Sequence, residues 1–184
     1  MMGSVENTRI EPSVRGMVYA SLFGALTAVG AFISVPLQPV PVTLHTLFVN
    51  LAAALLGGSL GALSQITYVL LGIIGLPVFS GGKAGFGVLL GPTGGYLIGF
   101  IAGAFFMGKL AELNSRPKFL YFFLIMVAGH VVIYSCGIIQ LLYVAKLTLG
   151  KGLAVGVLPF LPGDLLKIWA ASYIAVKLRD RIRI

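Results

Sequence analysis

Long runs of apolar residues, separated by short polar or glycine- and proline-rich stretches, dominate the chain. A helix needs roughly 20 apolar residues to cross the hydrocarbon core of a bilayer. No charged residue occurs between Thr46 and Gly82, and Gly57-Gly58 is the natural point at which to divide that stretch. We therefore expect an all-α, polytopic membrane protein with about six transmembrane helices in one membrane domain, residues 1–184. The predicted spans are residues 17–35, 42–56, 59–76, 92–108, 119–142 and 162–176.

Composition supports lipid as the solvent for most of this surface. Hydrophobic residues make up 58% of the chain and charged residues only 10%, whereas soluble domains carry roughly 25% charged residues. The mean hydropathy is +1.02. The net charge of +8 comes from Lys and Arg placed between the apolar runs and at the chain ends. That distribution is typical of membrane anchoring and argues against a nucleic-acid partner.

The distribution of basic residues predicts the orientation in the cell membrane. With the amino terminus inside, the outer segments hold only Lys83, Lys146 and Lys151. The inner segments hold Arg9, Arg15, Lys109, Arg116, Lys118, Lys177, Arg179, Arg181 and Arg183. This bias predicts that both termini are cytoplasmic. Charge alone is compatible with removal of the first span as a signal peptide, but that span lacks a convincing small-residue cleavage site, so we expect it to be retained.

Asp164 and Lys167 stand in or beside the last predicted span, close to its outer end. An ionised side chain at membrane depth costs about 2.5 kcal/mol or more, so both should face protein or a watery cavity. Three positions apart, they share one helix face. They either form an internal ion pair at the start of the helix or bind a polar solute, with the carboxylate accepting N–H groups and the ammonium holding an anion or a carbonyl oxygen.

The glycine-rich segment 79–87 is either a lid over a pocket or merely a permissive loop. Ser80, Lys83 and the N–H groups before Tyr96 are candidates for receiving an anion. His45 and His130 lie in different spans and acidic residues are few, so no metal site and no cofactor are expected. We expect His45 to be a polar contact near the outer mouth and His130 to be a hydrogen-bonded interior residue.

Small residues recur every four positions in the first span, at Ala20, Gly24 and Ala28. Such a stripe allows another helix to approach closely in lipid. It forms either an internal packing surface or a docking face for a partner protein.

Four ordered motifs closely resemble the BioY family, the biotin-specific substrate-binding (S) subunits of energy-coupling factor (ECF) transporters. They are Pro-Val-Pro-Val-Thr-Leu-His-Thr-Leu-Phe48, Gly-Leu-Pro-Val-Phe79, Leu-Leu-Gly-Pro-Thr-Gly-Gly-Tyr96 and Pro-Phe-Leu-Pro-Gly-Asp-Leu-Leu-Lys167. The likeness covers nearly all of residues 15–180. It departs from the usual family pattern at His45, where Gln is expected.

The resemblance implies a six-helix fold with a biotin pocket open to the outside. Asp164 and Lys167 match the family's ligand-contacting Asp-x-x-Lys, and the loop around Gly81–Gly87 would help to close the pocket. The Ala20/Gly24/Ala28 stripe would dock on a transmembrane coupling protein that carries two cytoplasmic ATPases, so the chain itself is not expected to be an enzyme. The candidate substrate-binding residues are Thr43, His45, Ser80, Gly82, Lys83, Phe86, Tyr96, Asp164 and Lys167.

Three other interpretations remain open at this stage. One is a binding subunit for another small vitamin, which titration with biotin, thiamine and riboflavin would separate from a biotin subunit. An intramembrane enzyme is disfavoured by the scarcity of paired acids, His and Cys. A purely structural multi-span protein would leave Asp164 and Lys167 without an evident purpose.

Overall fold

A computed structural model describes residues 13–114 and 116–182. Within them the chain forms a helical bundle with one two-stranded ribbon. The helices are α1 (Val14–Phe32), α2 (His45–Ile73), α3 (Gly87–Leu90), α4 (Gly94–Glu112), α5 (Phe119–Ala145), α6 (Leu149–Gly156) and α7 (Leu161–Leu178). The antiparallel strands are β1 (Ser34–Val35) and β2 (Val42–Thr43), with Ser34 opposite Thr43.

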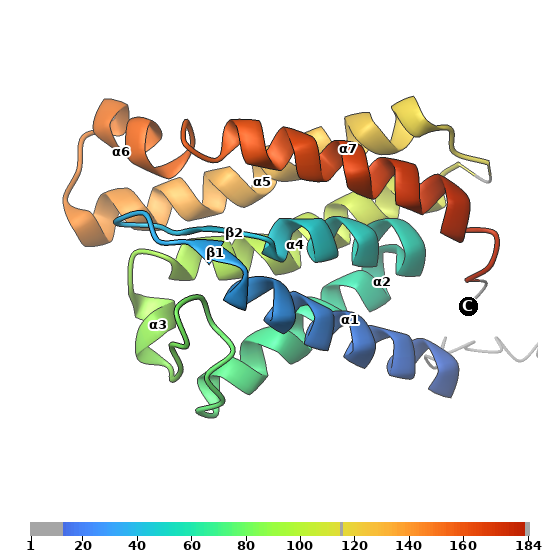
Figure 1. Ribbon diagram of the computed structural model, residues 1–184, viewed down its shortest axis with the longest axis horizontal. Helices are drawn as coiled ribbons and strands as arrows, with labels where there is room; N and C mark the ends of the chain where they lie inside the picture. The colour runs from blue at the N-terminus through green and yellow to red at the C-terminus, as the bar shows by residue number, and fades with distance from the viewer. Residues whose placement is uncertain (1–12, 115, 183–184) are drawn as a thin grey trace, which may run out of the picture.

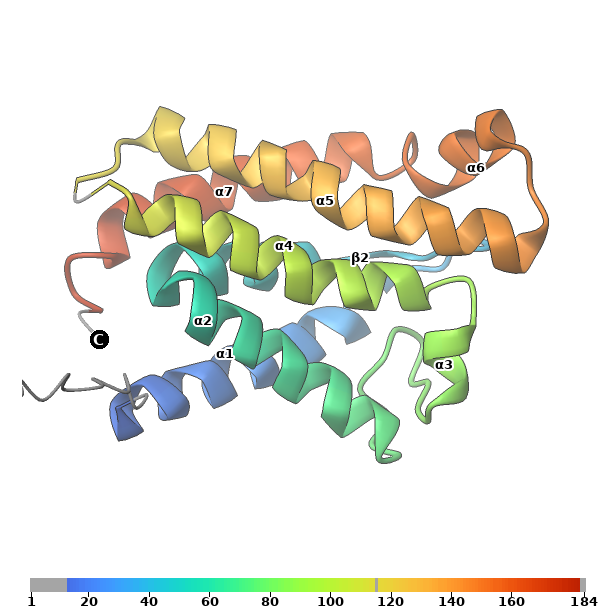
Figure 2. The same ribbon diagram turned by 180° about the vertical axis from the view of Figure 1, so that it is seen from behind.

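The long helices run side by side, and the two ends of the bundle differ (Figure 1). The ribbon, α3 and α6 gather at one end, which we call the mouth end. The start of α1, the end of α7 and the connection between α4 and α5 lie at the opposite end, the inner end (Figures 1 and 2). The first and last described helices therefore begin and end on one side, as the prediction of two cytoplasmic termini requires.

Helix α2 is two helical segments joined by a sharp break at Gly57. The backbone there has φ 83° and ψ −175°, a combination that is essentially restricted to glycine. The chain reverses at this point, and the second half of α2 returns towards the mouth end (Figure 2). A Cβ atom on Gly61 would lie 3.1 Å from the Cα of Ala53, so the two halves touch. The division proposed at Gly57-Gly58 coincides with this reversal.

Among the described residues, four helices (α1, α2, α4 and α5) are long and apolar enough to cross a membrane. The pair α6 and α7, bent by 51°, adds a fifth candidate. With the two halves of α2 considered separately, α1, α4, α5 and α7 complete the set of helical rods predicted from the hydropathy pattern. The expected all-α membrane fold is confirmed.

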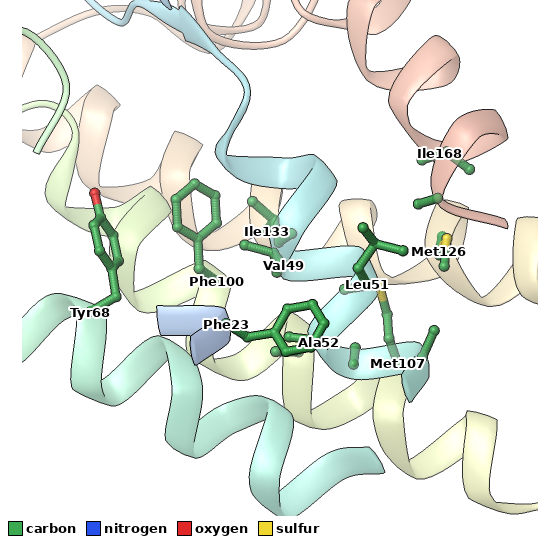
Figure 3. Close-up of a cluster of buried hydrophobic side chains, with 14 of the residues drawn as sticks. Phe23, Val49, Leu51, Ala52, Tyr68, Phe100, Met107, Met126, Ile133 and Ile168 are labelled. Atoms are coloured by element: carbon green, nitrogen blue, oxygen red, sulfur yellow. The ribbon is translucent and has the colours of Figure 1, made fainter. Parts of the chain in front are cut away.

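Apolar side chains from five helices meet in the interior of the bundle (Figure 3). Small residues allow this close packing: a Cβ on Gly99 would lie 2.8 Å from the Ile133 carbonyl oxygen, and one on Gly108 would lie 2.4 Å from the Gly58 nitrogen. Large apolar side chains such as Val131 and Leu166 are also exposed on the outside. An apolar exterior around an apolar core is the pattern expected for a protein surrounded by lipid.

The small-residue stripe of α1 is an internal packing surface. Ala20 is 1% exposed, Ala28 is buried, and a Cβ on Gly24 would lie 2.9 Å from the Ser64 carbonyl oxygen on α2. The docking face predicted for these three residues is therefore not retained, because α2 already covers them. The exposed face of α1 carries a different pair of small residues at the same spacing, Ser21 and Ala25.

Candidate ligand-binding site

A cavity lies between the bundle and the loops of the mouth end. It encloses about 720 Å³, counting the part that is open to solvent. Seven of the nine predicted binding residues line it, from β2, α2, the glycine-rich loop, α4 and α7: Thr43, His45, Ser80, Lys83, Tyr96, Asp164 and Lys167.

The other two predicted residues lie outside the cavity lining. Phe86 is 58% exposed at the start of α3. Gly82 has φ 71°, and a Cβ on it would meet nothing within 4 Å. Gly82 therefore adopts a left-handed backbone conformation that favours glycine. The turn it makes places Ser80 and Lys83 at the cavity.

The acidic centre of the site is Asp164, in the first turn of α7, where Pro162 helps to start the helix. One carboxylate oxygen, Oδ1, accepts hydrogen bonds from Thr46 Oγ1 at 2.8 Å and from Lys167 Nζ at 2.7 Å. The other, Oδ2, accepts one from the Tyr134 hydroxyl on α5. Three helices are thus joined at one buried carboxylate, whose side chain is only 7% exposed.

Lys167 has no spare donor in this arrangement. Its ammonium donates to Asp164, to the Thr43 carbonyl oxygen at 2.6 Å and to Thr46 Oγ1 at 3.2 Å. An ammonium has three N–H groups, whereas a carboxylate can accept about four hydrogen bonds. Asp164 receives three from the described residues, so the carboxylate retains capacity for one further donor and Lys167 retains none.

His45 links the ribbon to the glycine-rich loop. Its ring nitrogens lie 2.6 Å from Thr43 Oγ1 and 2.6 Å from the Tyr68 hydroxyl, which donates to the Val78 carbonyl oxygen at 3.3 Å. Each ring nitrogen therefore has one hydroxyl partner. Both nitrogens are engaged, so His45 is a connecting residue here rather than a free contact.

Aromatic and aliphatic side chains form the remaining wall, among them Phe100, Ile133 and Phe160. The Tyr96 hydroxyl donates to the Gly156 carbonyl oxygen at 2.8 Å and fastens α4 to α6. Lys83 also lines the cavity, is exposed, and takes part in neither of the two ion pairs formed among residues 13–114 and 116–182. The cavity therefore combines an apolar wall, one carboxylate acceptor and one unpaired cation.

Sequence reasoning missed Thr46, Tyr68 and Tyr134. Thr46 lies in the quoted motif that ends at Phe48, and Tyr134 interrupts a strongly apolar helix with a hydroxyl. Those signals are weak, because an isolated hydroxyl is also tolerated in ordinary helix packing. No group of three or more potential metal ligands occurs in the described part of the chain.

The model of the BioY family matches residues 4–184. This chain belongs to the BioY family. The Thermotoga maritima protein described as "Biotin transporter BioY" is 46% identical over 166 residues, covering 90% of this chain and 96% of the relative. The Pyrococcus horikoshii protein described as "Probable biotin transporter BioY" is 42% identical and covers 86% of this BioY chain and 93% of the relative.

A solved structure has the same fold as this BioY chain. It is the S-component for biotin from an ECF-type ABC transporter, determined at 2.1 Å, with a TM-score of 0.83 and 29% sequence identity. The likeness covers 91% of this chain and 92% of the solved one. The membrane-spanning character expected from the apolar runs is thereby confirmed for a multi-pass BioY protein.

Proposed function

We propose that this BioY chain captures biotin from outside the cell as the substrate-binding subunit of an ECF-type importer. The observation that carries the proposal is the composition of the cavity: an acceptor with unused capacity at Asp164, an unpaired cation at Lys83 and an apolar wall between them. Biotin combines a ureido group rich in N–H donors, an apolar thioether ring and a carboxylate tail, which match these three features.

The arrangement assigns an end of the ligand to each charged residue. A ureido N–H donates to the remaining acceptor position of Asp164, deep in the cavity. The carboxylate tail points outwards to Lys83 at the rim. Lys167 acts chiefly by holding Asp164 ionised and in place, because its own three N–H groups are already used. Biotin is a transported ligand in this scheme, and no cofactor is proposed.

Direct titration tests the proposed ligand. Calorimetry on the purified protein in detergent is expected to give saturable binding of biotin, with no measurable heat for thiamine or riboflavin. Binding of another vitamin in preference to biotin would assign the chain a different ligand within the same class. No saturable binding of any of the three would contradict the capture role.

Energy for transport is proposed to come from a transmembrane coupling protein and two cytoplasmic ATPases. The surface of α1 available for docking is the exposed face with Ser21 and Ala25, whose small side chains permit close helix approach. We expect Ala25→Leu to leave biotin affinity unchanged and to reduce cellular uptake and copurification of the coupling protein.

Gly24→Leu is the matched comparison on the face of α1 that α2 covers. Its side chain would meet the backbone of α2 at Ser64, so this variant should lower the thermal midpoint rather than act on docking alone. Unaltered uptake by the Ala25 variant would show that the coupling protein docks elsewhere.

A further inference from the structure

Two polar side chains are buried in the bundle without a full set of hydrogen bonds. Asn50 on α2 is 0% exposed, and neither its amide oxygen nor its amide nitrogen has a partner among the described residues. His130 on α5 is 4% exposed, and its Nε2 has none in the same part of the chain. Buried polar atoms are almost always paired, with protein groups or with ordered water. Neither residue lines the ligand cavity.

Helix register places both residues at one level. Asn50 is one turn inward of Thr46, and His130 is one turn inward of Tyr134, because the first half of α2 runs towards the inner end whereas α5 runs towards the mouth end (Figure 1). Thr46 and Tyr134 bond the two oxygens of the same carboxylate, Asp164. Residues four apart share a helix face. Asn50 and His130 therefore face the same interior region, about 6 Å inward of that carboxylate at 1.5 Å per residue.

The donors and acceptors of the two side chains specify what fits between them. His130 Nδ1 lies 2.9 Å from the Met126 carbonyl oxygen. A carbonyl only accepts, so Nδ1 carries the ring proton and Nε2 presents a lone pair. Asn50 offers one acceptor oxygen and an amide nitrogen that donates. A direct Asn50–His130 bond would still leave the Asn50 oxygen unpaired, whereas one water molecule can donate to both acceptors and accept from the amide.

We propose that Asn50 and His130 form a closed site for one ordered water molecule, one helical turn inward of Asp164. Three hydrogen bonds to otherwise unpaired buried groups are the usual requirement for an internal water. This level of the bundle is closed to bulk solvent, because Asn50, His130 and Ile168, one turn along α7 from Asp164, are 0%, 4% and 2% exposed. The water joins α2 to α5 one turn inward of Asp164, whose carboxylate accepts hydrogen bonds from both helices.

A crystal structure of the unchanged protein, at a resolution that places internal waters, tests the site directly. The expected result is one water within hydrogen-bonding distance of Asn50 Oδ1, Asn50 Nδ2 and His130 Nε2. A direct bond between the two side chains, or a dry contact between them, would overturn the proposal. The result does not depend on which vitamin the cavity binds, so failure of the biotin assignment leaves this test unaffected.

A double-mutant cycle on thermal stability tests the shared site by a second route. Asn50→Leu and His130→Phe should each lower the thermal midpoint by several degrees, because each leaves unpaired polar groups behind. The double variant should be no less stable than the worse single variant, because both polar partners are then gone. Additive losses would mean that the two residues do not share a water.

Gln65→Leu provides the control for this cycle. Gln65 is also fully buried, but it bonds to Thr27 and Ser64 at the contact between α1 and α2. Combined with His130→Phe, it should give additive losses. If Gln65 and His130 were as non-additive as Asn50 and His130, the coupling would not be specific to a shared water, and the inference would be overturned.

Discussion

The mouth end and the inner end of the bundle both contain acidic and basic side chains, but they use them differently. At the mouth end, Asp164 collects donors from three helices and retains accepting capacity towards a cavity. At the inner end, Glu112 accepts from the Gly58 backbone nitrogen at 2.8 Å and pairs with Lys109 at 2.8 Å, with both side chains nearly half exposed.

Arg179 is a second inner-end charge that bonds backbone groups. It donates to the Ala111 and Asn114 carbonyl oxygens and so ties the end of α7 to the end of α4. These inner-end charges satisfy backbone groups that a chain reversal and a helix terminus leave free. The difference is that side chains converging on a cavity hold Asp164, whereas the inner-end charges mainly bond backbone groups.

The largest effect on binding is expected from Asp164→Asn. The variant replaces a charged acceptor by a neutral amide and leaves Lys167 buried without its counter-charge. Hydrogen bonds to charged groups contribute about 1.5–3 kcal/mol, so biotin affinity measured by calorimetry should fall at least about tenfold.

Glu112→Gln is the matched control from the inner end, since it makes the same chemical change to a carboxylate that faces no cavity. Its biotin affinity should stay within about twofold, a difference of roughly 0.4 kcal/mol. Equal losses of biotin affinity in the two variants would show that the two ends do not differ in their contribution to binding.

The next effect concerns stability and belongs to the inner end. Gly57→Ala would force an L-residue into φ 83° and bring its Cβ within 2.5 Å of a Glu112 carboxylate oxygen. Backbone strain of this kind costs about 1–3 kcal/mol. The thermal midpoint should drop by several degrees, while biotin affinity of the folded fraction stays unchanged. A Gly57→Ala variant that kept its thermal midpoint but bound biotin more weakly would contradict the assignment of stability to the inner end and binding to the mouth end.

A smaller effect is expected from Lys83→Met, which removes the cation proposed to meet the carboxylate tail. A solvent-exposed ion pair contributes about 0.2–1 kcal/mol. The loss of biotin affinity should therefore be no more than about fivefold, and this loss should be smaller at high salt. Biotin methyl ester, which lacks the anionic tail, should bind the variant and the unchanged protein equally. A persisting difference with the ester would assign Lys83 another role.

The rods and the break at Gly57 were predictable because long apolar runs and a glycine pair are local signals. The partners of Asp164 were not, since Thr46 is 118 positions away and Tyr134 is 30 positions away. Only the packing of α2, α5 and α7 brings them together. The local sequence also does not determine how the glycine-rich loop folds. It therefore could not show that Ser80 and Lys83 line the cavity whereas Gly82 and Phe86 do not.

The sequence could not decide between packing and docking for the small-residue stripe of α1 for a different physical reason. In a soluble helix the buried face is the apolar one, but α1 is apolar on every side because lipid and protein are similar surroundings for its side chains. Small residues occur on both faces, at Ala20 and Gly24 and again at Ser21 and Ala25. Only the position of α2 decides which face remains accessible.

The short first half of α2 also determines how far a captured solute has already travelled. Thr46 stands eleven residues before the reversal at Gly57, which corresponds to about 16 Å at 1.5 Å per residue. That length is about half of a hydrocarbon core about 30 Å thick, so a reversal at the inner boundary would hold the Asp164 cluster near mid-depth. Under the proposed function, loading from outside would then complete about half of the crossing and leave the other half to the energised step.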